Sequence, residues 1–156
     1  MRTLKFVSAA PLILVLATGA AAEDFKLYPG AAQYTPPDTE VSRKWNEALP
    51  PGTTISAYIT RDSFDKVVSY YKNSARQYTS PHTRMGRKLP NGQEMQLAFF
   101  IFDGASDLST SRSWAKVQHP FVGSVPGKGG KPEFTDIRDA TEIVLTERKA
   151  IPKTKP

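Results

Sequence analysis

A helical spacing of apolar residues is the clearest pattern in the chain. Between Asp62 and Tyr78, apolar side chains recur every three or four residues, which places them on one face of an α-helix. The residues of this face are Phe64, Val67, Val68, Tyr71, Ala75 and Tyr78. Asp62 is expected to cap the helix, since its carboxylate can accept hydrogen bonds from the first free N–H groups. Ser80-Pro81 should end the helix, because proline cannot continue it.

Runs of β-branched and aromatic residues predict strands on both sides of this helix. The expected strands are 54–60, 83–89, 94–102, 114–119 and 141–148. Asn91-Gly92 predicts a tight turn between the second and third strands, because these residues accept the positive φ angles of a hairpin. The third strand contains the continuous apolar run 97–102, which is typical of a central strand. The segment 123–132 is rich in glycine and proline and is expected to be a mobile loop.

Residues 23–53 differ in character from the rest of the chain. They contain five prolines, which exclude a long helix or a central strand there. We expect an extended arm, held against the body by Tyr28, Tyr34 and Trp45. A short helix is expected within 39–49, where apolar residues recur at a spacing of four.

These elements together predict a single α+β domain over residues 54–148. It should contain a mostly antiparallel sheet of four to five strands with one main helix packed on one face. The other face should be covered by the arm or by a partner, or else be polar. Residues 149–156 are expected to form a disordered basic tail. The predicted core residues are Phe64, Val67, Val68, Tyr71, Ala75, Leu97, Phe99, Ile101, Ile143 and Leu145.

The first 22 residues have the composition of an export signal. Arg2 and Lys5 precede the apolar stretch 6–16, and Ala20-Ala21-Ala22 supplies the small side chains that a signal peptidase requires. The apolar stretch is shorter than the roughly 20 residues of a transmembrane helix. We therefore expect cleavage after Ala22 and a mature protein without a transmembrane span, located in the periplasm or secreted.

The composition excludes several classes of function. The chain has no cysteine, which excludes disulfides, cysteine-bound metals and thiol nucleophiles. Loss of Arg2 and Lys5 with the signal leaves 19 basic residues against 15 acidic ones, a net charge of +4. Lys153 and Lys155 lie in the tail, so the body is nearly balanced in charge. This balance argues against a dedicated nucleic-acid binder, and no nucleic acid is expected as a partner.

The candidate catalytic residues are few and lie far apart in the sequence. His82 and His119 are the only histidines, and Asp103 and Asp107 flank a short turn after the predicted central strand. None of them stands at the spacing of a metal-binding or nucleophilic motif. The plainer interpretation is two locally bonded histidines and two turn carboxylates. We therefore assign no catalytic residue, metal site or cofactor from the sequence.

The strand before the predicted hairpin turn is basic, with Arg84, Arg87 and Lys88 close together. Such a patch can bind an acidic envelope component or an acidic protein through contacts that weaken with salt. The alternative is a solvated sheet edge, where cations prevent further strands from adding. These three residues are the candidates for binding an anionic partner.

Three short motifs carry a resemblance to a known group of proteins. They are Tyr28-Pro29-Gly30-Ala31, Tyr58-Ile59-Thr60-Arg61-Asp62-Ser63-Phe64 and Tyr70-Tyr71. Through them the chain resembles a group of small exported bacterial proteins of uncharacterised function. The resemblance implies a strand–helix unit followed by further strands, and it implies no catalytic or binding residues.

The sequence therefore favours an exported, non-enzymatic binding or structural module of the bacterial envelope. One alternative is a small periplasmic hydrolase or metal-dependent enzyme that uses His82, His119 and nearby carboxylates. Another is a carrier of a small apolar ligand, which would need a cavity between the helix and the sheet.

Overall fold

The central element of the fold is an antiparallel sheet. The computed structural model describes residues 24–79, 87–126 and 132–149. Within these ranges six strands follow in the order β1-β2-β9-β6-β5-β3, and the short strand β4 also pairs with β5. The strands are β1 (Ala32–Tyr34), β2 (Thr53–Thr60), β3 (Arg76–Tyr78), β4 (Arg87–Lys88), β5 (Glu94–Ile101), β6 (Ser113–His119) and β9 (Thr141–Arg148).

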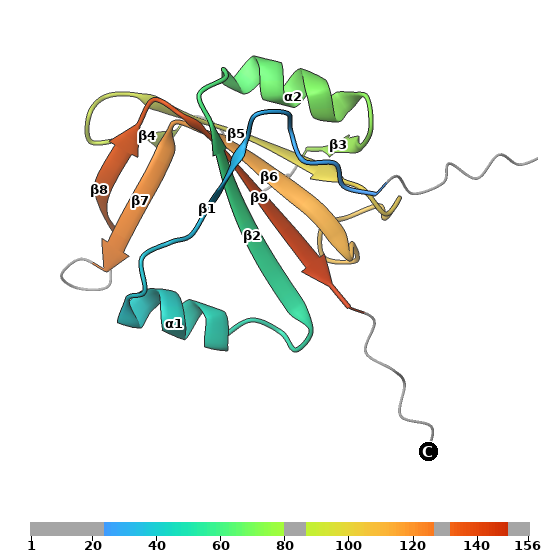
Figure 1. The fold of residues 1–156 in the computed structure, drawn as a ribbon, viewed down its shortest axis with the longest axis horizontal. Coiled ribbons are helices and arrows are strands. Elements are labelled where there is room, and N and C mark those ends of the chain that lie inside the picture. Colours follow the sequence, from blue (N-terminus) through green and yellow to red (C-terminus); the bar gives the residue numbers. More distant parts are fainter. Residues whose placement is uncertain (1–23, 80–86, 127–131, 150–156) are drawn as a thin grey trace, which may run out of the picture.

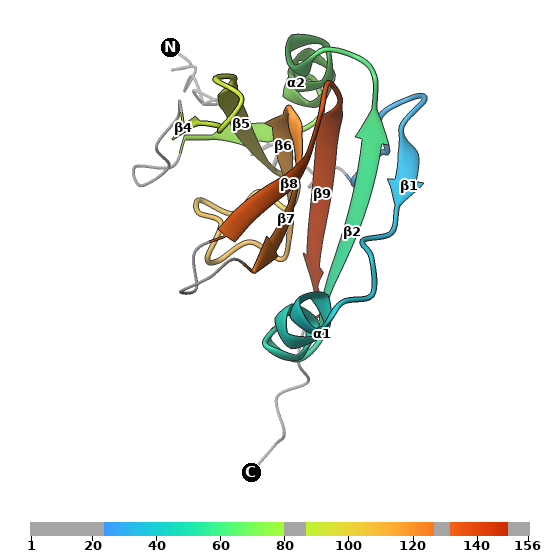
Figure 2. The ribbon, with the colours of Figure 1, turned by 90° about the vertical axis from the view of Figure 1, so that its left-hand side faces the viewer.

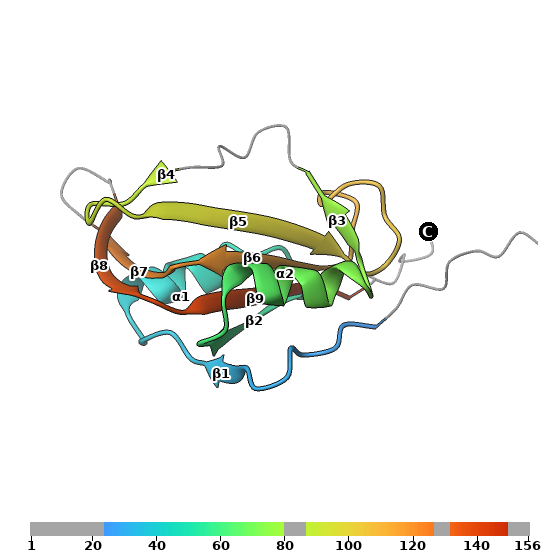
Figure 3. The ribbon, with the colours of Figure 1, turned by 90° about the horizontal axis from the view of Figure 1, so that it is seen from above.

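One helix covers one face of this sheet, and a second helix and a two-stranded ribbon lie on the opposite side. Helix α2 (Phe64–Lys72) packs over β6 and β5 on one face (Figure 3). Helix α1 (Glu40–Glu47) lies on the other side, together with the ribbon of β7 (Phe121–Pro126) and β8 (Pro132–Arg138) (Figures 1 and 2). The predicted α+β class with one main helix on a mostly antiparallel sheet is confirmed, although the sheet has more strands than expected.

The core lies between α2 and the sheet. On β5 the even-numbered residues Ala98 and Phe100 face the helix, and Phe102 continues this row. Because partners across an antiparallel ladder share a face, Val117 and Ile143 belong to the same layer. Six of the ten predicted core residues are buried, namely Val67, Val68, Tyr71, Ile101, Ile143 and Leu145. The other four, Phe64, Ala75, Leu97 and Phe99, are only half-buried.

The predicted helix is too long at its C-terminal end and wrongly capped. Helix α2 ends at Lys72, and the N–H groups of Ser74 and Ala75 both bond to the Tyr71 carbonyl in the turn that follows. The next residues form β3, whose pairing with the apolar strand β5 overrides the helical spacing. Ser63 occupies the N-cap position and makes no side-chain capping bond. Asp62 instead bonds to the side chains of Tyr28 and Lys66.

The N-terminal arm is attached through aromatic side chains. Tyr28 is buried, and its N–H donates to the hydroxyl of Tyr71 over 3.2 Å. Tyr34 packs edge-on against Phe121 with ring centroids 5.0 Å apart. The expected short helix is present as α1, but Trp45 is 72% exposed, so the prediction that Trp45 anchors the arm is wrong.

The predicted loop 123–132 is wrong in part. Residues 123–126 belong to β7 and Pro132 begins β8, and the two strands pair from Phe121 opposite Arg138 to Pro126 opposite Pro132. The ladder shifts register at Gly123, whose added Cβ would lie 2.9 Å from Asp136 Cβ. Glycine there permits the close approach of the two strands. Residues 127–131, the predicted signal 1–22 and residues 150–156 of the predicted tail lie outside the described ranges.

The sheet face opposite α2 is of mixed character. Leu97, Phe99 and Trp114 are half-buried on it, and Ile55 is 48% exposed. Near its middle, Lys116 on β6 forms an ion pair with Glu142 on β9 over 3.3 Å. In the described ranges, none of the helices has the length and apolar character needed to cross a membrane.

Candidate functional site

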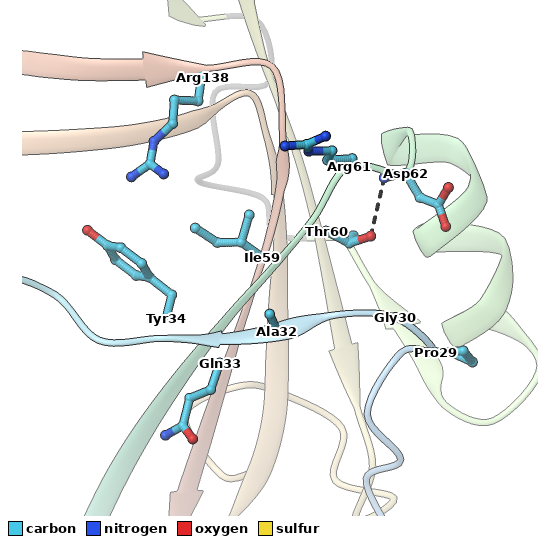
Figure 4. A pocket seen from close by; sticks show the side chains of 10 residues that line it. All are labelled: Pro29, Gly30, Ala32, Gln33, Tyr34, Ile59, Thr60, Arg61, Asp62 and Arg138. Atoms are coloured by element: carbon cyan, nitrogen blue, oxygen red, sulfur yellow. Dashed lines mark hydrogen bonds between the residues drawn. The ribbon is translucent and has the colours of Figure 1, made fainter.

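An open groove of about 500 Å³ lies beside the last residues of β2 (Figure 4). Its apolar wall is made by Ala32 and Tyr34 of β1 and by Ile59 of β2. Ala32 is paired directly with Ile59, so both side chains point to the face away from α2. The turn before β1 contains Gly30 at φ +81°, a conformation that favours glycine. Arg61, Asp62 and Arg138 form the polar rim.

Arg138 is held in place by two aromatic rings and one carboxylate. Its guanidinium carbon lies 4.5 Å from the centre of the Phe121 ring and 5.9 Å from that of Tyr34, within the range of cation–π attraction. Its Nε and Nη2 donate to the carboxylate of Asp136 over 2.7 to 3.1 Å. Arg138 therefore presents a fixed guanidinium whose charge Asp136 largely balances.

Arg61 is the free cation of the groove. It directly follows β2 and is exposed, and its side chain extends over the groove towards Arg138 (Figure 4). Its guanidinium makes no hydrogen bond or ion pair with any residue in the described ranges. It therefore retains its full set of donors for a ligand.

Asp62 is ionised but already has partners. The Tyr28 hydroxyl donates to its Oδ2 over 2.7 Å, and Lys66 Nζ donates to Oδ1 over 3.0 Å. The hydrogen bond from Tyr28 and then that from Lys66 lower the pKa of Asp62 below its ordinary value. The Asp62 N–H also donates to Thr60 Oγ1, which fixes the turn from β2 into α2 (Figure 4).

The charges around the groove leave one positive charge without a partner. Arg138 is paired with Asp136, and Lys66 is paired with Asp62. Among the described cations that line the groove, only Arg61 has no carboxylate partner. An anionic group is therefore the ligand that this rim favours.

His119 lies between a hydroxyl and a carboxylate, an arrangement that superficially resembles a catalytic triad. Its Nδ1 is 3.2 Å from Thr141 Oγ1, and its Nε2 is 3.4 Å from Asp139 Oδ1. The Thr141 hydroxyl, however, donates its proton to the Asp62 carbonyl over 2.7 Å, and Thr141 is fully buried. A hydroxyl bonded in this way and shielded from solvent cannot serve as a nucleophile. The group holds β6, β9 and the start of α2 together.

Asp103 and Asp107 lie at the opposite end of β6 from His119 and are not brought together with it. Asp103 accepts from the Ser111 hydroxyl and the Arg112 N–H just before this seven-residue strand begins. At about 3.3 Å per residue, the strand separates Asp103 from His119 by roughly 20 Å. Burial raises the pKa of Asp103, but the hydrogen bonds from Arg112, Ser111 and Ala105 outweigh it, so the pKa is lowered overall.

Asp107 has a similar structural role. It accepts from Tyr78, 2.6 Å away, and from the hydroxyl and N–H of Ser109. No group of three histidine, aspartate or glutamate residues that could hold a metal ion occurs in the described part of the chain. His82 lies outside the described ranges.

The basic hairpin stays a prediction. Lys88 is exposed on β4, while Arg84 and the side chain of Arg87 lie outside the described part of the chain.

The groove could not be predicted from the sequence, because its parts come from the arm, the end of β2 and the end of β8. The available signal was Arg61 directly after a predicted strand, within the motif 58–64.

Comparisons of the chain with protein families, with curated proteins and with solved structures find no match. The resemblance to small exported bacterial proteins therefore stays an expectation, and the function must be argued from the groove itself.

Proposed function

We propose that this protein is a non-catalytic binding module that holds an anionic group of its ligand in the groove beside β2. The observation that carries the proposal is the guanidinium of Arg61 over the groove, which has no partner among the described residues and shares the rim with the stacked guanidinium of Arg138. Arginine pairs with carboxylates and phosphates through two parallel hydrogen bonds, which gives both affinity and orientation.

The proposed setting is the bacterial envelope, after export and removal of residues 1–22. This part of the proposal rests on the export signal in the sequence and places the module where acidic envelope components are available. The basic residues Arg84, Arg87 and Lys88 would add a second, salt-sensitive contact to such a partner.

The alternative functions have less support. A hydrolase would need a free hydroxyl or a bound metal beside His119, and the Thr141 hydroxyl is already bonded. A carrier of an apolar ligand would need space between α2 and the sheet. Aromatic rings occupy this layer, with Phe25 5.8 Å from Tyr71 and 5.3 Å from Phe102 between ring centroids.

The proposal is tested by NMR chemical-shift mapping with sodium acetate and with inorganic phosphate. We expect at least one of them to shift resonances of Arg61, Arg138 and Ile59 together, and Arg61→Gln to abolish the response. The matched control is Arg112→Gln, since Arg112 is also exposed but lies at the far end of β6. An equal loss in both variants, or no response at the groove, would overturn the proposal.

A further inference from the structure

We infer that the groove selects a monocarboxylate attached to an apolar group, an inference that rests on the proposed function and names its ligand class. Three features of the described groove lead to this class: its single uncompensated charge, its apolar wall and its free hydrogen-bond donors.

The charge of the groove fits one negative charge and not several. Arg61 is the only lining cation without a carboxylate partner within the described ranges. The carboxylates of Asp62 and Asp136 stay close to the rim, where they repel any additional negative charge on a ligand. A phosphate dianion would bring a second negative charge, and none of the described cations of the rim is free to balance it.

The wall of the groove fits an apolar body. Ile59 and Tyr34 are half-buried, and the Ile59 side chain stands between Tyr34 and the guanidinium of Arg61 (Figure 4). A carboxylate bound to Arg61 would therefore place its neighbouring carbons against Ile59 and the Tyr34 ring. Each methylene buried there should tighten binding by up to about fourfold.

The free donors fit the geometry of a carboxylate. Arg61 offers the planar fork that binds both carboxylate oxygens. The hydroxyl of Tyr34 makes no hydrogen bond with any residue in the described part of the chain and lies at the rim on the Arg138 side (Figure 4). It is a second donor for a ligand oxygen.

Four probes separate charge from apolar contact: hexanoate, hexanamide, acetate and inorganic phosphate. Dissociation constants are measured by NMR titration of the chain starting at Glu23, at constant ionic strength. We expect hexanoate to bind at least about tenfold more tightly than acetate, hexanamide or phosphate. Arg61→Gln should reduce hexanoate binding to the level of hexanamide.

Ile59→Thr tests the apolar wall, with Ile55→Thr as the matched control. Both residues lie on the same face of β2, but Ile55 is outside the groove. Ile59→Thr should weaken hexanoate at least threefold and leave acetate unchanged, whereas Ile55→Thr should change neither. Should Ile59→Thr fail to fold, the ratio of hexanoate to acetate affinity in the unmodified chain decides the point.

The outcomes distinguish this inference from the proposed function. Tighter binding of phosphate than of hexanoate, still dependent on Arg61, would overturn the monocarboxylate inference and keep the anion-binding proposal. Equal binding of hexanoate and acetate would also overturn it. Failure of every probe to bind at Arg61 would overturn both.

A monocarboxylate with an apolar body can be a small acid or the C-terminus of a peptide. Acetyl-Ala-Ala-Leu with a free or an amidated C-terminus separates the two sources. Tighter binding of the free peptide than of hexanoate, with loss on amidation, supports a peptide C-terminus. Weaker binding of the free peptide than of hexanoate supports a small acid.

Discussion

Two tyrosine–aspartate hydrogen bonds join parts of the chain that are far apart in the sequence. The Tyr28 hydroxyl donates to Asp62 over 2.7 Å, and the Tyr78 hydroxyl donates to Asp107 over 2.6 Å. In both pairs the hydrogen bond lowers the pKa of the aspartate and raises that of the tyrosine. Local spacing along the sequence predicts neither pair. It predicts Asp62 only as a helix cap, because the residue stands just before the helical pattern.

The Tyr78–Asp107 pair makes the stability of the fold depend on pH in the acid range. Hydrogen bonds from Tyr78 and Ser109 lower the pKa of Asp107 from 3.8 to about 2. Because the folded pKa is lowered, the ionised carboxylate stabilises the fold above about pH 4, and this contribution is lost as the pH falls towards 2. Tyr78→Phe should raise the pKa of Asp107 and diminish the loss of stability between pH 4 and 2. Carboxyl NMR titration and unfolding at several pH values measure both effects.

Tyr70→Phe is the control for this prediction, since within the described ranges the Tyr70 hydroxyl bonds only to the Leu27 carbonyl, at 3.5 Å. It should leave the pKa of Asp107 where it is. An unchanged pKa of Asp107 in Tyr78→Phe would show that the Ser109 contacts alone determine it.

At the scale of elements, the sequence predicts those whose own residues carry a regular pattern. Strands β2, β5, β6 and β9 were found within one residue of their observed bounds, because half-buried strands alternate in polarity or run apolar. The three-residue strand β3 was missed, since the helical spacing continues through Ala75 and Tyr78 while the backbone has already turned at Asn73. The ribbon was missed because Gly123 and the prolines at 126 and 132 are typical of loops, and only pairing with a second strand orders them.

Helix α1 should contribute little to the stability of the fold. Most of its residues are exposed, and Trp45 is 72% exposed. Trp45→Ala should therefore change the free energy of unfolding by less than about 0.5 kcal/mol. Ile101→Ala should reduce it by about 2–5 kcal/mol, because Ile101 is only 1% exposed and its loss leaves a cavity. Urea denaturation compares the two variants, and a cost above about 1 kcal/mol for Trp45→Ala would contradict this assignment of α1.

For the molecule as a whole, the N-terminal segment connects the core to the groove. Phe25 and Tyr28 pack into the layer beneath α2, while Ala32 and Tyr34, a few residues later, form the wall of the groove. None of these four residues lies in the domain 54–148 that the helix and strand patterns delimit. The arm could be recognised from its prolines, but its role in the core follows from contacts with residues such as Phe102, which spacing along the sequence does not reveal.

One buried hydrogen bond contributes to the attachment of this segment. The Tyr28 N–H donates to the hydroxyl of Tyr71, which is fully buried. Tyr71→Phe keeps the ring but leaves this N–H without its acceptor, at a cost of about 1–3 kcal/mol. Thermal unfolding should show the loss, and hydrogen exchange at the Tyr28 amide should accelerate in the variant. Unchanged exchange at this amide would show that the bond does not hold the segment.

The predicted cleavage site lies only three residues before the first aromatic residue of the core. Cleavage after Ala22 retains Phe25, whose ring contacts Tyr58, Tyr71 and Phe102. We therefore expect the exported protein to have the mass of residues 23–156.

A chain starting at Glu23 should unfold at the same temperature as that protein. One starting at Leu27 should lose about 1–3 kcal/mol, because the Phe25 ring is removed from the core. Equal melting of the two shortened chains would exclude Phe25 from the core, and a mass that retains residues 1–22 would refute the cleavage site.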